Sequence, residues 1–206
     1  MGAIPLILCV TGPMAAGKNA VSSILEEKDF ISVDADILTH KAIENITPEI
    51  LKTFSALAKE KNITLTAEDG KINRRALGEL IFSSKELIEK QEALVYPEVN
   101  SLLEEFIKTN KDKNIILNAT LLYKIDVIKK VDKVLFVDSP VFVRFLRAKR
   151  RDGLKTIQIL RRFKAQKNLF AKYKKSGADI RRVWNVGSRK SLQKKIDIFL
   201  KLTDRG

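Results

Sequence analysis

A glycine-rich segment near the start of the chain has the residue types of a phosphate-binding loop. It reads Gly12, Pro13, Met14, Ala15, Ala16, Gly17, Lys18, Asn19 and Ala20. An apolar run, Ile4 to Val10, precedes it, and an amphipathic stretch, Ala20 to Glu27, follows it. In a strand–loop–helix unit of this kind, backbone N–H groups at the helix N-terminus bind phosphate, and the Lys side chain reaches the β- and γ-phosphates of a nucleotide. We therefore expect residues 12–20 to bind a nucleoside triphosphate; the alternative is a chance turn before a helix.

One position of this loop differs from the usual pattern. The residue after the Lys is normally Ser or Thr, because that hydroxyl ligates Mg²⁺, whereas this chain has Asn19 and then Ala20. The side-chain carbonyl of Asn is also an oxygen donor suited to Mg²⁺. We predict that Asn19 contacts the ion or one of its waters and that Asp34 helps from further away. The alternative is that Asn19 only caps the following helix and the loop supports no turnover.

Two carboxylates follow the next apolar segment, Ile31 to Val33. They are Asp34 and Asp36. In a parallel sheet this strand end faces the phosphate loop, so one carboxylate can accept a proton from an attacking hydroxyl and either can hold Mg²⁺ through water. We predict that Asp36 is the base. The alternative is that both are loop acids that cap the next helix.

The positive charge of the chain is concentrated in one segment. The formal net charge is +14, and residues 144–175 hold 13 Lys or Arg residues and one acid, a net +12. A basic segment in a nucleotide-binding enzyme is typical of a lid that closes over several phosphates. Arg147 and Arg151 are four residues apart, so on a helix both can project over a transferred phosphoryl group. A solvated basic face and an RNA-binding helix are the alternatives, but no aromatic residues form a nucleic-acid groove here, so we expect no nucleic-acid partner.

Apolar segments alternate with helical patterns along the chain. Besides residues 4–10 and 31–33, the expected strands are Ile115 to Leu117, Val134 to Val137 and Ile180 to Trp184. Such alternation is typical of an α/β protein with a parallel sheet, whose ligands bind at the carboxyl ends of the strands. Asp138-Ser139-Pro140 indicates a helix start with Ser139 at the N-cap and Pro140 at the first position.

The length of 206 residues favours one domain with elaborations. We expect a core from residues of about 1–40, 111–143 and 178–206, a mostly helical insert over about 41–110, and a lid over about 144–177. No apolar run approaches the roughly 20 residues that cross a bilayer. The apolar start also lacks the basic region of a signal peptide, so we expect a cytoplasmic protein without membrane association.

Several motifs, taken together and in order, resemble those of the dephospho-coenzyme A kinases. The matches are Thr11-Gly12 to Lys18, Asp34-Ala35-Asp36, Asp69-Gly70-Lys71-Ile72-Asn73-Arg74-Arg75-Ala76-Leu77 leading to Ile81-Phe82, Val131-Asp132-Lys133-Val134, Val137-Asp138, Arg147 with Arg151-Asp152-Gly153, Ala165-Gln166, Ala178-Asp179 and Asn185-Val186-Gly187. They extend over nearly the whole chain, and their shared order and spacing is more specific than any one of them.

This resemblance implies a P-loop kinase-like parallel sheet flanked by helices, with a helical substrate-binding insert and a basic lid. It implies transfer of the γ-phosphate of ATP to the ribose 3′-hydroxyl of dephospho-CoA, with Mg²⁺. Lys18, Asp36, Arg147 and Arg151 are then the catalytic residues. The resemblance further places the adenine of ATP near Asn185 and Gly187, and the acceptor near Asp36, Arg74, Arg75 and Leu77.

Three parts of the chain depart from that family's pattern. The loop lacks its Ser-Thr, a His-Pro pair reads Tyr96-Pro97, and an Asp-x-Pro-Leu-Leu-x-Glu segment reads Asn118-Ala119-Thr120-Leu121-Leu122-Tyr123-Lys124. These changes concern Mg²⁺ and acceptor contacts more than the fold. Two other functions therefore stay open: a kinase of the same fold with another nucleotide-like acceptor, and a nucleotide-binding protein that no longer catalyses transfer.

Overall fold

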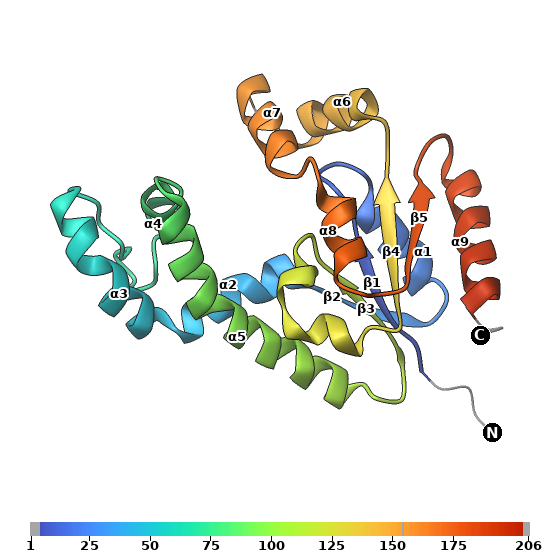
Figure 1. Cartoon of the computed structure of the whole chain (residues 1–206), viewed down its shortest axis with the longest axis horizontal. Coiled ribbons are helices and arrows are strands. Elements are labelled where there is room, and N and C mark those ends of the chain that lie inside the picture. The colour runs from blue at the N-terminus through green and yellow to red at the C-terminus, as the bar shows by residue number, and fades with distance from the viewer. Residues whose placement is uncertain (1–4, 154, 204–206) are drawn as a thin grey trace. The chain divides into compact units, whose positions relative to one another are not determined.

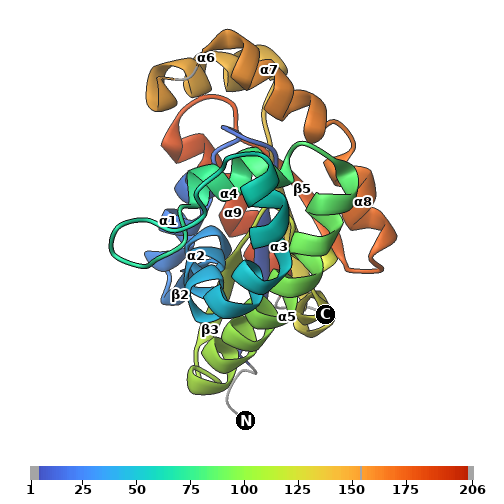
Figure 2. The same ribbon diagram turned by 90° about the vertical axis from the view of Figure 1, so that its left-hand side faces the viewer.

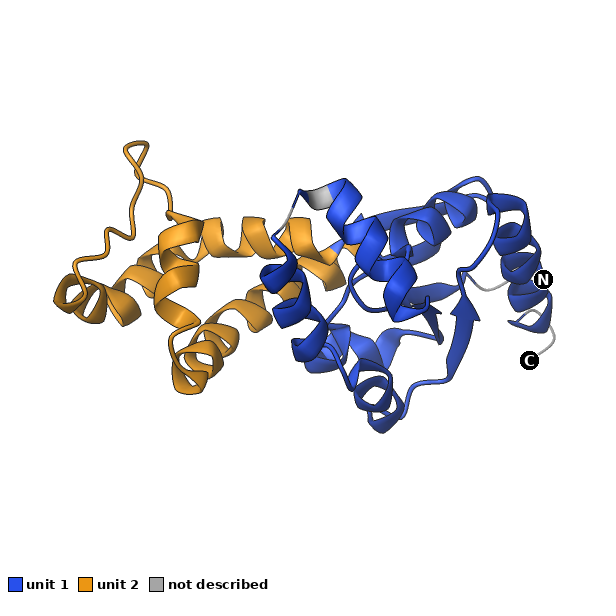
Figure 3. Cartoon of the chain, turned by 90° about the horizontal axis from the view of Figure 1, so that it is seen from above, with its two compact units in different colours: residues 1–34, 107–206 blue, residues 35–106 orange. Residues whose placement is uncertain are grey.

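The computed structural model describes residues 5–153 and 155–203. The chain divides into two compact units, shown in different colours in Figure 3. The sheet unit comprises Met1–Asp34 and Ile107–Gly206, and the helical unit comprises Ala35–Phe106. Among the described residues, no helix combines the length and the apolar character that crossing a membrane requires.

The sheet unit is built on five parallel strands. They are β1 (Ile7–Thr11), β2 (Phe30–Asp34), β3 (Asn114–Asn118), β4 (Lys133–Asp138) and β5 (Ile180–Trp184), in the order β2-β3-β1-β4-β5. This confirms the α/β class and all five predicted strands. The first strand begins at Ile7 rather than at Ile4, a residue outside the described ones. Pro5 has no N–H for a ladder, and the N–H of Leu6 donates to the side chain of Asn114 instead (2.9 Å).

Both faces of this sheet are covered. Alternate strand residues, such as Leu8 and Val10 on β1, are buried against α1 (Lys18–Glu26) and α9 (Arg189–Thr203) (Figure 1). On the opposite face, Phe136 meets the ring of Phe170 on α8 (Leu169–Lys175) edge to face, with ring centroids 5.0 Å apart. Burial on both faces explains why the three central strands, β3, β1 and β4, read as continuous apolar runs in the sequence.

The remaining helices of the sheet unit lie between β3 and β5. Two short 3₁₀ turns, η1 (Leu122–Lys124) and η2 (Asp126–Lys130), join β3 to β4. The basic segment forms α6 (Val141–Asp152), α7 (Thr156–Ala165) and α8. We call α6 and α7 the lid helices. Gly153 ends α6 with φ 58°, the left-handed conformation expected of a glycine at a turn between helices.

The predicted start of α6 is wrong by one residue. Its N-cap is Pro140, and the Ser139 side chain does not cap it. The Ser139 hydroxyl instead lies 2.7 Å from the carbonyl oxygen of Asn185 and 3.2 Å from that of Ala16, as a buried donor. A tertiary hydrogen bond has therefore replaced the local cap that the sequence favoured.

The helical unit contains α2 (Ala35–Asn45), α3 (Thr47–Glu60), α4 (Arg74–Ile81) and most of α5 (Lys85–Thr109). Ile50 and Phe54 on α3, with Leu77 and Leu80 on α4, are buried. Between α3 and α4 the chain forms a long loop, seen in Figure 2, closed by an antiparallel bridge between Thr66 and Ile72.

Candidate active site

The glycine-rich loop lies at the carboxyl end of β1, the central strand, and leads into α1. Gly12 has φ 149°, and a Cβ atom there would lie 2.1 Å from the carbonyl oxygen of Val137. The loop backbone thus passes directly against the end of β4. No side chain fits at position 12, so the glycine is required by close approach of two backbones.

Gly17 is required for a similar reason at the other end of the loop. It is the N-cap of α1 with φ 101°, and a Cβ atom would lie 2.0 Å from Nδ2 of Asn185. No described side chain caps α1. No described side chain therefore competes with an anion for the positive end of the α1 dipole.

The carbonyl group of Ala16 fixes the orientation of the loop. It accepts from Nδ2 of Asn185 (2.9 Å), the hydroxyl of Ser139 (3.2 Å) and a guanidinium nitrogen of Arg147 (3.4 Å). In a planar trans peptide the C=O and the following N–H point in opposite directions. The donors from Asn185 and Arg147 on this carbonyl therefore orient the peptide, with the N–H of Gly17 pointing away from Asn185.

Lys18 is the first residue of α1, and its ammonium nitrogen lies 3.5 Å from the carbonyl oxygen of Gly12. This contact folds the side chain back across the loop that it follows. A cation held over a ring of backbone N–H groups is the arrangement that binds the outer phosphates of a nucleotide. The predicted contacts of residues 12–20 with the phosphates of a nucleotide stay a prediction.

Arg147 lies on α6, and its described hydrogen bonds are to other parts of the protein. Besides Ala16, its guanidinium donates to the hydroxyl of Ser139 (3.0 Å) and to the carbonyl oxygen of Asn185 (3.3 Å). Its described partners therefore fix the loop and the end of β5. Arg151 lies one turn later on the same helix and is exposed. The catalytic roles of both arginines stay predictions.

Asn185 and Gly187 follow β5. Asn185 is buried, with its backbone N–H donating to Asp138 (2.8 Å) and its side chain to Ala16. Gly187 is exposed with φ 92°. Asn185 thus positions the phosphate loop, and the predicted closeness of both residues to adenine stays a prediction.

The side chains of Asn19 and Asn118 meet near the start of α1, and Asp34 lies on the neighbouring strand in register with Asn118. Asn118 ends β3, in register with Val10 on β1 and with Asp34 on β2. Its Nδ2 donates to Oδ1 of Asn19 (3.2 Å), while its own Oδ1 is buried and accepts no hydrogen bond from the described part of the chain. Sequence reasoning noted Asn118 only as a departure from a family pattern and did not connect it with Asn19.

These three side chains fit a magnesium ion that arrives with a nucleotide. The residues that the structure describes contain no group of three or more His, Cys, Asp or Glu placed to hold a metal. Mg²⁺ at a phosphate site, however, takes one or two protein oxygens beside phosphates and waters. The unsatisfied Oδ1 of Asn118, beside Asn19 and one strand from Asp34, is an oxygen of this kind. The metal role predicted for Asn19 and Asp34 stays a prediction.

The other predicted residues belong to the helical unit. Asp36 is exposed in the first turn of α2, which begins at Ala35, so Asp36 is not the cap of this helix. Arg74 and Arg75 are exposed at the start of α4, where Arg75 meets Glu79 (3.4 Å). Leu77 is 2% exposed and packs inside this unit. The predicted contacts of these residues with an acceptor stay predictions.

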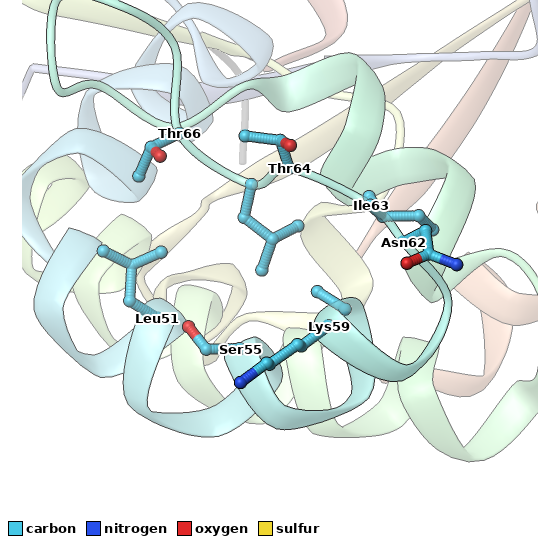
Figure 4. A pocket seen from close by; sticks show the side chains of 9 residues that line it. Leu51, Ser55, Lys59, Asn62, Ile63, Thr64 and Thr66 are labelled. Atoms are coloured by element: carbon cyan, nitrogen blue, oxygen red, sulfur yellow. The ribbon is translucent and has the colours of Figure 1, made fainter.

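The helical unit also has a hollow of its own, of about 520 Å³ (Figure 4). It lies between α3 and the segment that follows it, and it is lined by Leu51, Ser55, Ala58, Lys59, Asn62, Ile63, Thr64, Leu65 and Thr66. Arg74, Arg75 and Leu77 are not among these residues. The hollow and the predicted acceptor contacts are thus separate features.

A buried tyrosine links α8 to the segment after β3. The Tyr173 hydroxyl accepts from the N–H of Leu122 (3.0 Å) and lies 3.3 Å from the carbonyl oxygens of Ala119 and Thr120. Burial raises the pKa of Tyr173 well above its ordinary value, and burial also raises the pKa of the nearby Cys9 thiol to about 12. Both groups therefore stay protonated at neutral pH, and Tyr173 keeps a proton to donate.

A phosphate loop between the central strand and first helix of a five-stranded parallel sheet defines a P-loop nucleotide-binding fold. The family model for dephospho-CoA kinase matches residues 6–182 of this chain. A dephospho-CoA kinase from Treponema denticola is 38% identical over 93% of this chain and 87% of its own length, and one from Treponema pallidum is 34% identical over 97% and 95%. The crystal structure of TT1252 from Thermus thermophilus superposes with a TM-score of 0.79 at 29% identity, covering 97% of this chain and 98% of that one. The chain belongs to the dephospho-CoA kinase family.

Proposed function

We propose that this protein transfers the γ-phosphoryl group of ATP to the ribose 3′-hydroxyl of dephospho-CoA, which gives coenzyme A in the final step of CoA biosynthesis. One observation carries the proposal: the family match over residues 6–182 includes the phosphate loop, the helical unit and the lid helices together. The proposed partners are ATP and dephospho-CoA, and the cytoplasm, where both substrates occur, is the proposed location.

In this proposal the sheet unit binds ATP. The loop N–H groups and Lys18 hold its phosphates, and Asn185 and Gly187 lie near its adenine. Mg²⁺, when bound, would supply positive charge to offset the negative charge that develops during phosphoryl transfer. Asn19 and Asp34 would hold the ion, and Asn118 adds an oxygen beside them.

The acceptor and the proton are handled by the helical unit and the lid. Asp36 accepts the proton of the 3′-hydroxyl as that oxygen attacks phosphorus. Arg74, Arg75 and Leu77 belong to the acceptor side. Arg147 and Arg151 stabilise the charge on the transferred group, since a guanidinium grips phosphate oxygens at two points.

The test is turnover with identified products. Purified protein with ATP, Mg²⁺ and dephospho-CoA should release ADP and yield a product heavier than dephospho-CoA by one phosphate, as measured by mass spectrometry. If another nucleotide-like acceptor stimulates ADP release and dephospho-CoA does not, the substrate assignment is wrong.

A second candidate function is nucleotide binding without catalysis. It is favoured by one observation, the Asn19–Asn118 amide pair at the place where the usual loop carries a hydroxyl. It predicts ATP binding without ADP release, and restored turnover in Asn19→Ser. Turnover by the unmodified protein would exclude it.

A further inference from the structure

One lid residue makes a direct hydrogen bond to the backbone of the phosphate loop. The N–H of Met14 donates to Oε1 of Gln166 at 2.7 Å, across 152 positions of sequence. Gln166 is the C-cap residue of α7 and is half-buried. Because the donor is a backbone N–H, the partner atom must be the amide oxygen, so the orientation of this side chain is fixed by chemistry.

The loop needs such support because its next residue is strained. Ala15 has φ 60°, a left-handed conformation in a residue that has a Cβ atom. Such a residue costs about 1–3 kcal/mol and persists where its surroundings fix it. Met14 and Ala15 are each 8% exposed, and they pack with Ala148 of α6 and Ile159 of α7. The apolar contacts hold the side chains, and Gln166 holds the peptide between Pro13 and Met14.

The neutrality of the Gln166 side chain matters as much as its position. A carboxylate would also accept from the Met14 N–H, and charge-assisted hydrogen bonds are stronger than neutral ones. It would, however, place a negative charge beside the loop that receives a triphosphate. A neutral amide holds the loop without this repulsion.

We propose that Gln166 is a positioning residue for the triphosphate, which sets the Met14 peptide through a neutral acceptor and so couples the lid helices to the phosphate loop. This inference rests on the ATP binding in the proposed function. It is independent of the acceptor, so a protein that binds ATP but does not phosphorylate dephospho-CoA would contradict the proposed function and leave the role of Gln166 intact.

The experiment compares Gln166→Glu with a matched control, Gln158→Glu. Gln158 lies on the same helix, and its Oε1 also accepts from a backbone N–H, that of Lys155 (3.1 Å). The two variants therefore carry the same charge change, and each keeps an acceptor for a backbone donor. Calorimetric titration with Mg·ATP and with adenosine, together with urea unfolding, is carried out on the full chain.

We expect Gln166→Glu to unfold at the same urea concentration as the parent protein and to bind Mg·ATP on the order of tenfold more weakly. Adenosine, which has no phosphate, should bind both variants and the parent equally, and Gln158→Glu should bind Mg·ATP like the parent. Gln166→Met, which has no such acceptor, should weaken Mg·ATP binding by roughly 2- to 12-fold, as the loss of one neutral hydrogen bond implies.

Two results would overturn the proposal. Parent-like Mg·ATP binding by Gln166→Glu would show that the residue only supports the fold, because a carboxylate serves that purpose equally well. Equal weakening of Mg·ATP and adenosine binding would show a general disturbance of the nucleotide site rather than an effect on the triphosphate.

Discussion

Replacing Asn118 by Leu should separate stability from magnesium-dependent binding. Leu has nearly the shape of Asn, so little cavity forms at this buried end of β3. The change removes one hydrogen bond to Asn19, a contribution of about 0.5–1.5 kcal/mol, and it also removes a buried oxygen without a partner, whose burial costs about 1–3 kcal/mol. Because Asn19 is exposed, water replaces its lost donor. The free energy of unfolding should therefore rise by about 1 kcal/mol.

Binding should change in the opposite direction. If Oδ1 of Asn118 contacts Mg²⁺ or one of its waters, the lost contact is charge-assisted and contributes about 1.5–3 kcal/mol. Calorimetry should then show Mg·ATP binding about 10- to 150-fold weaker. ATP titrated with excess EDTA should bind as it does to the parent protein, because only the ion contact has changed.

Asn114→Leu is the matched control on the same strand. The side-chain oxygen of Asn114 accepts from the N–H of Leu6 (2.9 Å), so this substitution removes a satisfied partner. It should lower the free energy of unfolding by about 1 kcal/mol and leave Mg·ATP binding unchanged. The reasoning is refuted if Asn118→Leu behaves like Asn114→Leu, because the amide of Asn118 is then purely structural.

Three further predictions address the other residues of the site. Tyr173→Phe should lower the free energy of unfolding by about 1–3 kcal/mol in urea titrations, because a buried backbone N–H loses its acceptor. Tyr123→Phe is the control. An equal loss of stability in this control would contradict the account. Asp36→Asn should reduce kcat by about 10²- to 10⁴-fold with ATP affinity unchanged, and near-normal kcat would remove Asp36 from the mechanism. Arg151→Ala should reduce kcat by about 10²- to 10³-fold. The control Arg150→Ala removes the same charge from the adjacent exposed position and should retain the parent kcat. Equal losses of kcat in both variants would mean that the lid acts only as diffuse charge.

The centre of the sheet could be predicted from the sequence because strands β3, β1 and β4 are buried on both faces. Continuous apolar runs such as residues 134–137 leave few alternatives to a buried strand. The loop could be predicted because its motif is local: Gly12, Gly17 and Lys18 stand at their characteristic spacing directly after an apolar strand. In both cases the information lies within a few neighbouring residues.

The contacts that hold the loop could not be predicted in this way. Ala16 is bound by residues more than 120 positions away, and the Met14–Gln166 bond spans 152. Local rules even favoured another role for Ser139, as a helix cap. Its hydroxyl is buried instead, and a buried hydroxyl must find a partner, which here is a carbonyl from a distant element. At Ser139 the burial of the hydroxyl in the tertiary structure therefore outweighed the local preference for a helix cap.

The loop contacts of the lid helices share one electrostatic property. Arg147 donates to neutral oxygens of Ala16, Ser139 and Asn185, and Gln166 accepts through a neutral amide. A guanidinium paired with a carboxylate would have its field largely cancelled, whereas one bound to neutral acceptors keeps its full charge for an incoming anion. The lid helices thus attach to the phosphate loop without neutralising it. This explains how a segment with a net charge of +12 both supports the loop and attracts a triphosphate. It also explains why a carboxylate at position 166 should weaken Mg·ATP binding, although it completes the same hydrogen bond.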